Sequence, residues 1–269
     1  MNVKNGVVMT DNKLVTVYLL FRPRNMGYIY MYGAKVHFED EDLIYENAIV
    51  SPGKALILWK EMKIVDGGFI PDIIMPRLTK DVDYQFQIIS QEQPEHSLSL
   101  AMTTFDKDDQ QLNYQIFSGK AGTFSLTAKE ASYWLELASL GNQKLRFKMV
   151  LLAAAPLLSE YAITTKMVGG IRTVLIEPQE PQERSRLHIH VRNYTATIQA
   201  LNFEPKQEHL FILMPVQSSG IGDFTTSQIE ELVKYLNKFR QSNYVLQIDN
   251  NHATGELVKI LRAYISNNN

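Results

Sequence analysis

The sequence contains no cysteine, only two tryptophans in 269 residues, and nearly equal numbers of positive and negative side chains. The absence of cysteine excludes disulfides, thiolate zinc sites and cysteine nucleophiles, and it fits a reducing compartment. With 27 Lys and Arg against 29 Asp and Glu, the formal net charge of −2 gives no general attraction to phosphate backbones. We therefore expect no nucleic-acid partner.

Long apolar runs are also missing. The longest one, MVLLAAAPLL at 149–158, is far shorter than the ~20 residues that span a bilayer. The N-terminal residues lack the apolar core of a signal peptide. These two absences predict a soluble, cytoplasmic protein, and 269 residues are enough for two domains with buried cores.

Short runs rich in β-branched and aromatic residues follow one another through the first 153 residues, separated by turn residues and with no convincing helix pattern between them. Examples are LVTVYLLF (14–21), YIYMYGAKVHF (28–38), SLSLAMTTF (97–105) and SYWLEL (132–137). Many short strands at this spacing are typical of a β-sandwich or jelly roll. We predict such a domain over residues 1–155.

The pattern changes at AAAPLLSEYAITTKMVGG (153–170), which ends in a glycine pair suited to a hinge or a turn. Farther on, HLFILMPV (209–216) is nearly continuous in apolar residues, as expected for a strand buried on both faces. We place a domain boundary in this glycine-ended segment and predict a second, small domain over residues 171–269.

Two amphipathic helices are predicted near the end of the chain. Apolar residues recur at helical spacing in DFTTSQIEELVKYLNKFRQ (223–241), where Thr225 and Gln228 can form a capping box. The strand-like YVLQID (244–249) and a second helix, TGELVKILRAYI (254–265), follow. Strand, helix, strand, helix predicts a small α/β domain with at least two parallel strands.

Aromatic residues of the first domain provide candidate binding groups. Tyr28, Tyr30 and Tyr32 alternate with apolar residues, so in a strand they would share one face and could stack on sugar rings or a peptide. They could equally pack under a neighbouring strand. Trp59 ends the apolar run LILW, and a tryptophan in such a strand is more often core than ligand platform. We predict that Trp59 is core or near-core, and we keep it among the candidate binding residues as the floor beneath the tyrosines.

A weaker candidate is the loop PVQSSGIGDF (215–224), between the apolar strand and the first helix. Ser218, Ser219, Gly220 and Gly222 resemble a phosphate-binding turn at a helix N-terminus. However, the full dinucleotide pattern and the P-loop lysine are absent, so the glycines are explained as well by a tight turn.

Two further groups of residues are candidate chemical sites. His188 and His190 would project from one face of a strand and could share a metal, but no third ligand has matching spacing. Solvent-facing strand histidines are the simpler interpretation, and we expect no metal and no cofactor. Ser219, Asp249 and His252 do not follow any catalytic-triad layout, so we expect no catalytic residues.

An ordered series of short segments resembles a known family. YMYGAKVHF, then YEN at 45–47, then SPGKALILW, and later PEHSLSLAMTTFD and YWLELASLGNQKLRFKMVLL follow the order and spacing of the accessory Sec system Asp-three family. The resemblance covers about residues 18–152. It adds Asn47, the last residue of YEN, to the candidate binding residues. The chain differs from the family pattern at Ala34, where a serine is expected.

The resemblance implies a non-enzymatic component of the accessory Sec system with a β-sandwich similar to carbohydrate-binding modules. Its implied partners are the other accessory Sec proteins of the Asp group, the serine-rich-repeat adhesin that the system exports, and the accessory Sec motor ATPase. The implied place is the cytoplasm, with peripheral association at the inner face of the membrane allowed. A carbohydrate-active enzyme and a stand-alone glycan-binding module remain the alternatives.

Overall fold

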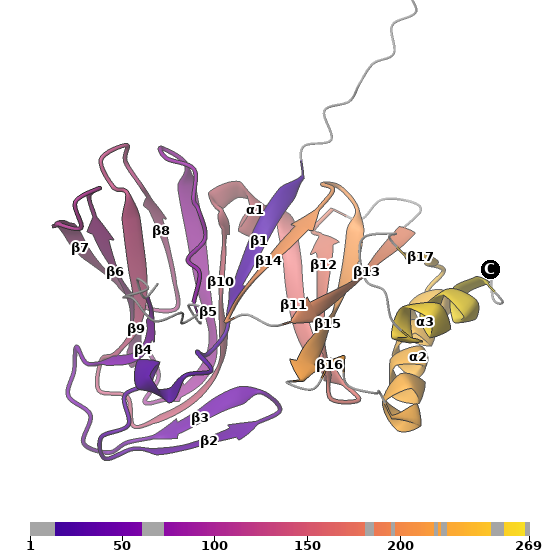
Figure 1. The fold of residues 1–269 in the computed structure, drawn as a ribbon, viewed down its shortest axis with the longest axis horizontal. Helices are drawn as coiled ribbons and strands as arrows, with labels where there is room; N and C mark the ends of the chain where they lie inside the picture. Colours follow the sequence, from indigo (N-terminus) through magenta and orange to yellow (C-terminus); the bar gives the residue numbers. More distant parts are fainter. Residues whose placement is uncertain are drawn as a thin grey trace, which may run out of the picture.

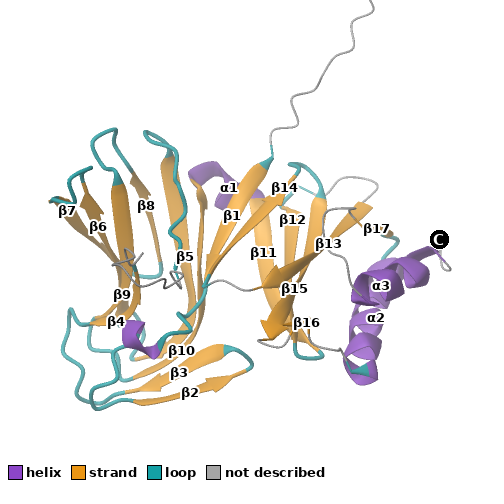
Figure 2. Cartoon of the chain, in the orientation of Figure 1, coloured by secondary structure: helices purple, strands orange, loops and turns teal. Residues whose placement is uncertain are grey.

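The fold is built mainly from β-strands, with a short helical part near the C-terminal end (Figure 1; Figure 2). The computed structural model describes residues 14–60, 73–180, 186–194, 197–217, 220–221, 225–248 and 256–266. These residues form a seven-stranded, a four-stranded and a six-stranded sheet, here called sheets A, B and C. No helix among the described residues has both the length and the apolar character needed to cross a bilayer.

Sheet A is antiparallel throughout and has the order β14-β1-β10-β3-β2, with β5 also paired to β10 and β8 paired to β5. Its strands are β1 (Val15–Leu20), β2 (Lys35–Glu39), β3 (Asp42–Glu46), β5 (Asp83–Gln93), β8 (Ala121–Ser125), β10 (Lys144–Ala154) and β14 (Ile198–Phe203). A bulge in β10 between Phe147 and Met149 separates the half that pairs with β3 from the half that pairs with β1.

Sheet B is antiparallel and has the order β4-β9-β6-β7. Its strands are β4 (Ala55–Trp59), β6 (Leu98–Phe105), β7 (Gln111–Ser118) and β9 (Ser132–Ser139). Alternate residues of β6 point into the core beneath the sheet, because strand side chains alternate between faces. Sheets A and B therefore make the β-sandwich that the sequence predicts.

Sheet C is mixed and has the order β11-β12-β15-β13-β17, with the short β16 paired to β15. Its strands are β11 (Tyr161–Val168), β12 (Ile171–Pro178), β13 (Arg186–Tyr194), β15 (Glu208–Gln217), β16 (Gly220–Ile221) and β17 (Val245–Ile248). β13 runs parallel to both β15 and β17. The apolar strand β15 lies inside the sheet between β12 and β13, as its sequence predicts.

The helices are few and short. They are η1 (Met26–Tyr28), α1 (Ala155–Glu160), α2 (Thr226–Gln241) and α3 (Glu256–Ser266). The predicted capping box is present at the start of α2, where Thr225 and Gln228 each bond the other's backbone N–H. Helix α2, strand β17 and helix α3 follow β15, which confirms the predicted α/β character of the C-terminal part.

Three apolar clusters lie between four successive layers: sheet B, sheet A, sheet C and the helices (Figure 1). The first cluster joins sheets A and B, the second joins sheets A and C, and the third joins sheet C to α2 and α3. Strand β1 and the second half of β10 in sheet A are thus covered on both faces. In β10, Val150 and Leu152 belong to the first cluster, whereas Met149 and Leu151 belong to the second.

Strand β14 crosses from one part of the chain to the other. It lies within the predicted C-terminal domain, 171–269, but it pairs with β1 in sheet A, with Tyr18 opposite Ala200. The chain leaves sheet C after β13, adds β14 to sheet A, and returns as β15. The glycine pair Gly169-Gly170 forms the turn between β11 and β12. The division into domains 1–155 and 171–269 stays a prediction.

Candidate functional site

The segment that carries the predicted tyrosine row is a loop and not a strand. Residues 26–28 form the 3₁₀-helix η1, capped by Asn25, whose side chain accepts from the Gly27 N–H at 2.8 Å. Strand β2 begins only at Lys35. The predicted common face of the three tyrosines is therefore wrong, because a local side-chain cap and a left-handed Gly33 (φ 68°) favour turns over a continuous strand.

We call residues 26–34 the tyrosine loop. Tyr28 and Tyr30 are half-buried and pack against the first apolar cluster, whereas Tyr32 is 73% exposed. The ammonium of Lys54 lies 4.5 Å from the ring centroid of Tyr30, within cation–π distance. Of the three predicted tyrosines, Tyr32 is the one that faces solvent most fully.

Asn47 holds the tyrosine loop from beneath. Its side chain is buried, and its Nδ2 donates to the Tyr32 carbonyl at 2.8 Å and to the Tyr45 hydroxyl at 3.1 Å. Its Oδ1 accepts from the Ile49 N–H at 3.0 Å. Because donors and acceptor are all engaged inside the protein, the structure assigns Asn47 an anchoring role at the place where the sequence predicts a binding residue.

The tyrosine loop also closes one edge of sheet B. Ile29 forms an isolated antiparallel bridge with Ile57, and the Tyr30 N–H donates to the Leu56 carbonyl at 3.0 Å. These contacts pair the backbone of the loop with β4. The loop is thus fixed at two points, to β4 on one side and to Asn47 on the other.

Three exposed apolar residues lie on this fixed loop or beside it, and we call them the tyrosine patch. They are Tyr32, Ile49 at 67% exposure and Met31 at 42%. A Cβ built on Gly33 would lie 2.9 Å from Cδ1 of Ile49, so Ile49 packs directly on the turn that presents Tyr32. Neither Ile49 nor Met31 is predicted from the sequence, because no local pattern marks them as exposed.

Trp59 lies in the core, as predicted. Its side chain is fully buried, its ring centroid lies 5.8 Å from that of Phe147, and its indole N–H donates to the Phe21 carbonyl at 2.7 Å. Trp59 therefore joins β4 of sheet B to sheet A, and it has no surface for a ligand. The second tryptophan, Trp134, is half-buried, with Phe105 against it and the Lys60 ammonium 3.8 Å from its ring centroid.

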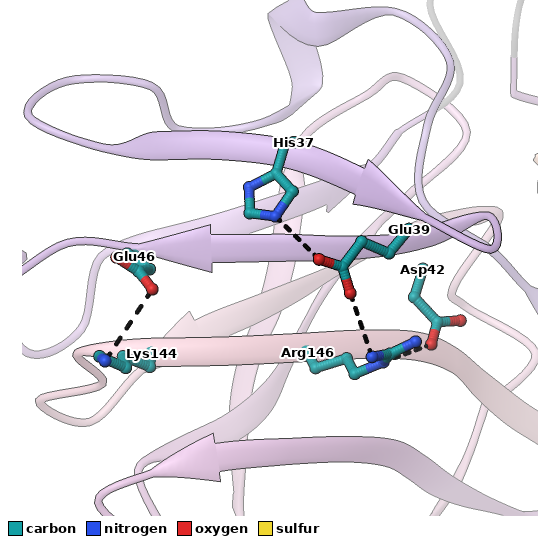
Figure 3. A network of polar contacts seen from close by, with 6 residues as sticks. All are labelled: His37, Glu39, Asp42, Glu46, Lys144 and Arg146. Atoms are coloured by element: carbon teal, nitrogen blue, oxygen red, sulfur yellow. Dashed lines mark hydrogen bonds and ion pairs between the residues drawn. The ribbon is translucent and has the colours of Figure 1, made fainter.

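A network of charges fastens the hairpin β2–β3, which follows the tyrosine loop, to β10. The Nε of Arg146 donates to the buried Asp42 at 2.8 Å, and its Nη1 lies 3.3 Å from Glu39. The hydrogen bond to Asp42 is the main reason that the pKa of Arg146 is raised. The complete network consists of His37, Glu39, Asp42, Glu46, Lys144 and Arg146 (Figure 3).

The weaker loop candidate is only partly described. Gly220 belongs to β16 and pairs with Gln217, whereas Ser218, Ser219 and Gly222 lie outside the described residues. Asp249 and His252, which with Ser219 are the residue types of a catalytic triad, also lie outside them. The phosphate-type loop stays a prediction.

The histidines of β13 differ from their predicted solvent-facing position. His188 is half-exposed, but His190 is buried, and its Nε2 lies 2.9 Å from Nδ1 of His209. His209 Nε2 donates to the Glu204 carbonyl at 2.8 Å, so His209 Nδ1 accepts and His190 donates. The pair was missed because β14 separates the two strands in the sequence. No group of three or more potential metal ligands occurs in the described ranges.

The chain was compared with known proteins. Residues 29–154 match the family Accessory Sec secretory system ASP3, and none of the curated proteins matches. Among solved structures, the accessory secretory protein 1, 2 and 3 structure of Streptococcus pneumoniae has 22% identity and a TM-score of 0.46, covering 50% of this chain and 94% of the other. The Glycosylation Associate Protein (Gap123) complex of Streptococcus agalactiae has 11% identity and a TM-score of 0.47, covering 93% and 87%.

A third similar structure is the CBM22-1-GH10 part of xylanase 10B from Clostridium thermocellum, solved with xylohexaose, at 8% identity and a TM-score of 0.32, covering 64% of this chain and 33% of the other. All three TM-scores are below 0.5, so the similarity to a family depends on the family match. That match spans the tyrosine loop from Ile29, the anchor Asn47, the core residue Trp59 and all of β10. Through residues 29–154, just under half of its length, the chain is similar to the Accessory Sec secretory system ASP3 family.

Proposed function

We propose that the chain is a non-enzymatic component of the accessory Sec system that uses the tyrosine patch to bind the other accessory Sec proteins of the Asp group. The observation that carries this proposal is an apolar surface held rigid on a domain similar to the ASP3 family. Tyr32, Ile49 and Met31 are exposed, yet the backbone that presents them is bonded to Asn47 and to β4.

A rigid apolar patch suits protein binding for two physical reasons. Exposed apolar side chains that lie together lose unfavourable contact with water when a partner covers them. A loop that is already ordered loses little conformational entropy on binding, so less of the contact energy is spent on ordering. A tyrosine adds a large, rigid contact area with a polar tip, which is why it is common at the centre of interfaces.

The test is co-expression of the full chain with the two other accessory proteins of the Asp group, followed by affinity capture. We expect a stable complex with the parent chain. Tyr32→Asp and Ile49→Asp should each weaken it by at least ~10-fold, because a carboxylate buried in an apolar interface must lose its water. The matched control is Ile74→Asp, at an apolar residue of 65% exposure outside the patch.

Equal capture of the parent chain and of both patch variants would reject the tyrosine patch as the binding surface. Absence of any complex with the parent chain would reject the proposed function itself. Thermal unfolding of each variant, which should match that of the parent, separates lost binding from lost folding.

The same proposal includes the exported substrate. We propose that the chain, acting in the cytoplasm, also engages the serine-rich-repeat adhesin, and that the motor ATPase receives the adhesin from the complex. Calorimetric titration with serine-rich peptides, with and without N-acetylglucosamine, tests this part. Binding that is lost in Tyr32→Asp would place the adhesin on the tyrosine patch, whereas unchanged binding would place it elsewhere on the chain.

A further inference from the structure

The second edge of sheet B differs from the first. The β4 edge is closed by the tyrosine loop, through the bridge from Ile29 to Ile57 and the hydrogen bond from Tyr30 to Leu56. The β7 edge pairs with β6 on its inner side, and among the described residues no strand pairs with its outer side. An uncovered edge strand presents a row of backbone N–H and C=O groups that can pair with another strand.

The sequence of β7 lacks the charged residues and the proline that commonly prevent such pairing. Natural edge strands are usually protected by charges or proline, but QLNYQIFS, residues 111–118, contains neither. Leu112, Tyr114 and Ile116 are 46%, 46% and 54% exposed. Tyr114 and Ile116 lie opposite Thr103 and Ala101, which face away from the core residues Leu100 and Met102. Tyr114 and Ile116 therefore lie on the outer face of sheet B, whereas Leu112 lies at the register shift between the pairs Thr104–Asn113 and Phe105–Gln111.

The residue order of β7 is nearly symmetric about Tyr114. One residue away on either side are the amides Asn113 and Gln115, and two residues away are the aliphatic Leu112 and Ile116. If two copies of β7 pair antiparallel with Tyr114 opposite Tyr114, each amide lies opposite an amide and each aliphatic residue opposite an aliphatic residue. A two-fold interface requires this kind of self-complementary surface.

The charges beyond the ends of β7 also suit antiparallel pairing. The turn that precedes it, residues 106–109, contains three aspartates and one lysine, and Lys120 follows it. In the pairing centred on Tyr114, Asp108 of one copy lies at the same level as Lys120 of the other. Within one copy, Nζ of Lys120 lies 2.6 Å from Oε2 of Glu92, and the Lys120 side chain is 39% exposed.

We propose that two copies of this chain associate through β7, with Tyr114 at the two-fold axis, so that two four-stranded sheets become one eight-stranded sheet. The backbone hydrogen bonds of the new ladder and the apolar side chains of Leu112, Tyr114 and Ile116 stabilise the dimer. This proposal does not depend on the function proposed above, which uses the opposite edge of sheet B.

Cysteine cross-linking tests the register directly, because the chain has no cysteine of its own. Opposed residues of an antiparallel pair have Cα atoms about 4.5–5.5 Å apart, within the usual range for a disulfide. We expect Tyr114→Cys to give a covalent dimer on mild oxidation. Chains with Leu112→Cys and chains with Ile116→Cys should cross-link when mixed and much less when oxidised separately.

Two controls accompany this experiment. Ile74→Cys, at 65% exposure outside β7, measures cross-linking by random collision. Tyr114→Lys places like charges opposite each other at the axis, and sedimentation of this variant should show a dimer dissociation constant raised at least ~10-fold with an unchanged melting temperature.

Three outcomes would overturn the proposal. The parent chain could sediment as a monomer at all concentrations, or the Tyr114→Cys variant could cross-link no faster than the Ile74→Cys control. A dimer could also persist in Tyr114→Lys, which would place the interface elsewhere. If the parent chain is monomeric and Tyr114→Lys instead loses capture of another accessory Sec protein, the β7 edge belongs to that partner and not to a second copy.

Discussion

Strands β10 and β7 belong to the same sandwich but occupy opposite situations in it. β10 lies in sheet A, between the two apolar clusters, and its last residues alternate between them. β7 lies at the edge of sheet B, and seven of its eight residues are exposed, the exception being Phe117. Their sequences differ accordingly: MVLLAA in β10 is continuously apolar, whereas QLNYQIFS alternates.

This difference shows which part of the protein depends on the rest of the chain. The first apolar cluster is contained between sheets A and B, but the second is shared by β1 and β10 with strands β12 and β15 of sheet C. A residue such as Leu151 is therefore buried by strands that follow it in the sequence. The stability of sheet A should depend on sheet C, while β7 and the tyrosine patch should be nearly independent of it.

The largest expected effect comes from shortening the chain to residues 1–155. This removes β14 and sheet C, and exposes Val17, Leu19 and Leu151 of the second cluster. We expect the shortened chain to aggregate or to lose cooperative unfolding, because a large apolar face would contact water. Size-exclusion chromatography and thermal denaturation provide the measurement.

Adding Leu19→Lys and Leu151→Lys to the shortened chain is the matched control, since it makes the exposed face polar. Recovery of a soluble, folded monomer would identify the lost cover of the second cluster as the cause. A shortened chain that unfolds cooperatively without these changes would contradict the dependence on sheet C and would support the predicted boundary at residue 155.

The next effect in size contrasts a buried aromatic residue with an exposed one. Trp59→Ala should lower the free energy of unfolding by about 3–5 kcal/mol, because it leaves a cavity between sheets A and B and removes the hydrogen bond to the Phe21 carbonyl. Tyr32→Ala should change it by less than about 0.5 kcal/mol. Urea unfolding measures both, and Trp59→Phe separates the lost hydrogen bond from the lost volume. A stable Trp59→Ala chain with impaired binding would return Trp59 to the ligand site.

A smaller effect is expected at the anchor of the tyrosine loop. Asn47→Ala removes two donated hydrogen bonds and one accepted one in a buried place, so we expect a loss of about 1–3 kcal/mol in unfolding free energy. The Ile49 N–H, which donates to Asn47, should exchange with solvent much faster, while the N–H groups of β7 should not change. Equal exchange rates at Ile49 in variant and parent would show that Asn47 does not hold the loop.

The features that could be predicted from the sequence are those that depend on hydrophobic periodicity or on local capping residues. The alternating strands, the apolar β15, the capping box at Thr225 and the buried Trp59 all follow from local patterns, and the structure confirms them. The sequence pattern could not show which distant segments pair or contact each other. The position of β14 in sheet A and the contact of His190 with His209 depend on strand order, which periodicity does not encode.

The candidate site was only partly predictable for a similar reason. Alternation of tyrosines with apolar residues is equally compatible with a strand and with a loop that buries some of them, and Asn25 and Gly33 decided for the loop. Ile49 became part of the tyrosine patch through its packing on Gly33, a contact of residues 16 positions apart. The ordered series of family motifs includes this region, but it does not reveal which side chains are exposed.

The smallest effect concerns Glu130, in the turn before β9, and Glu136, within β9. The pKa values of these two glutamates are shifted in opposite directions. Burial raises the pKa of Glu130, but hydrogen bonds from Thr104 at 2.7 Å and from the Thr127 N–H at 2.6 Å outweigh it, so the pKa is lowered below 4.5. A lowered folded-state pKa means that the carboxylate stabilises the fold fully at neutral pH, and that this contribution is lost as the pH falls through the lowered pKa. Burial raises the pKa of Glu136 despite the opposing charge of Lys60, so its contribution is lost as the pH rises through the raised value.

Glu130→Gln should therefore cost about 1 kcal/mol of unfolding free energy at pH 7, and the difference from the parent chain should shrink toward pH 3. Glu136→Gln is the matched control, because it replaces the same kind of residue. At pH 7 its free energy of unfolding should equal or exceed that of the parent chain, and the parent chain should become relatively more stable as the pH falls. Urea unfolding at several pH values measures both differences. Parallel pH dependences for the two variants would mean that the hydrogen bonds from Thr104 and Thr127 do not favour the charged form of Glu130.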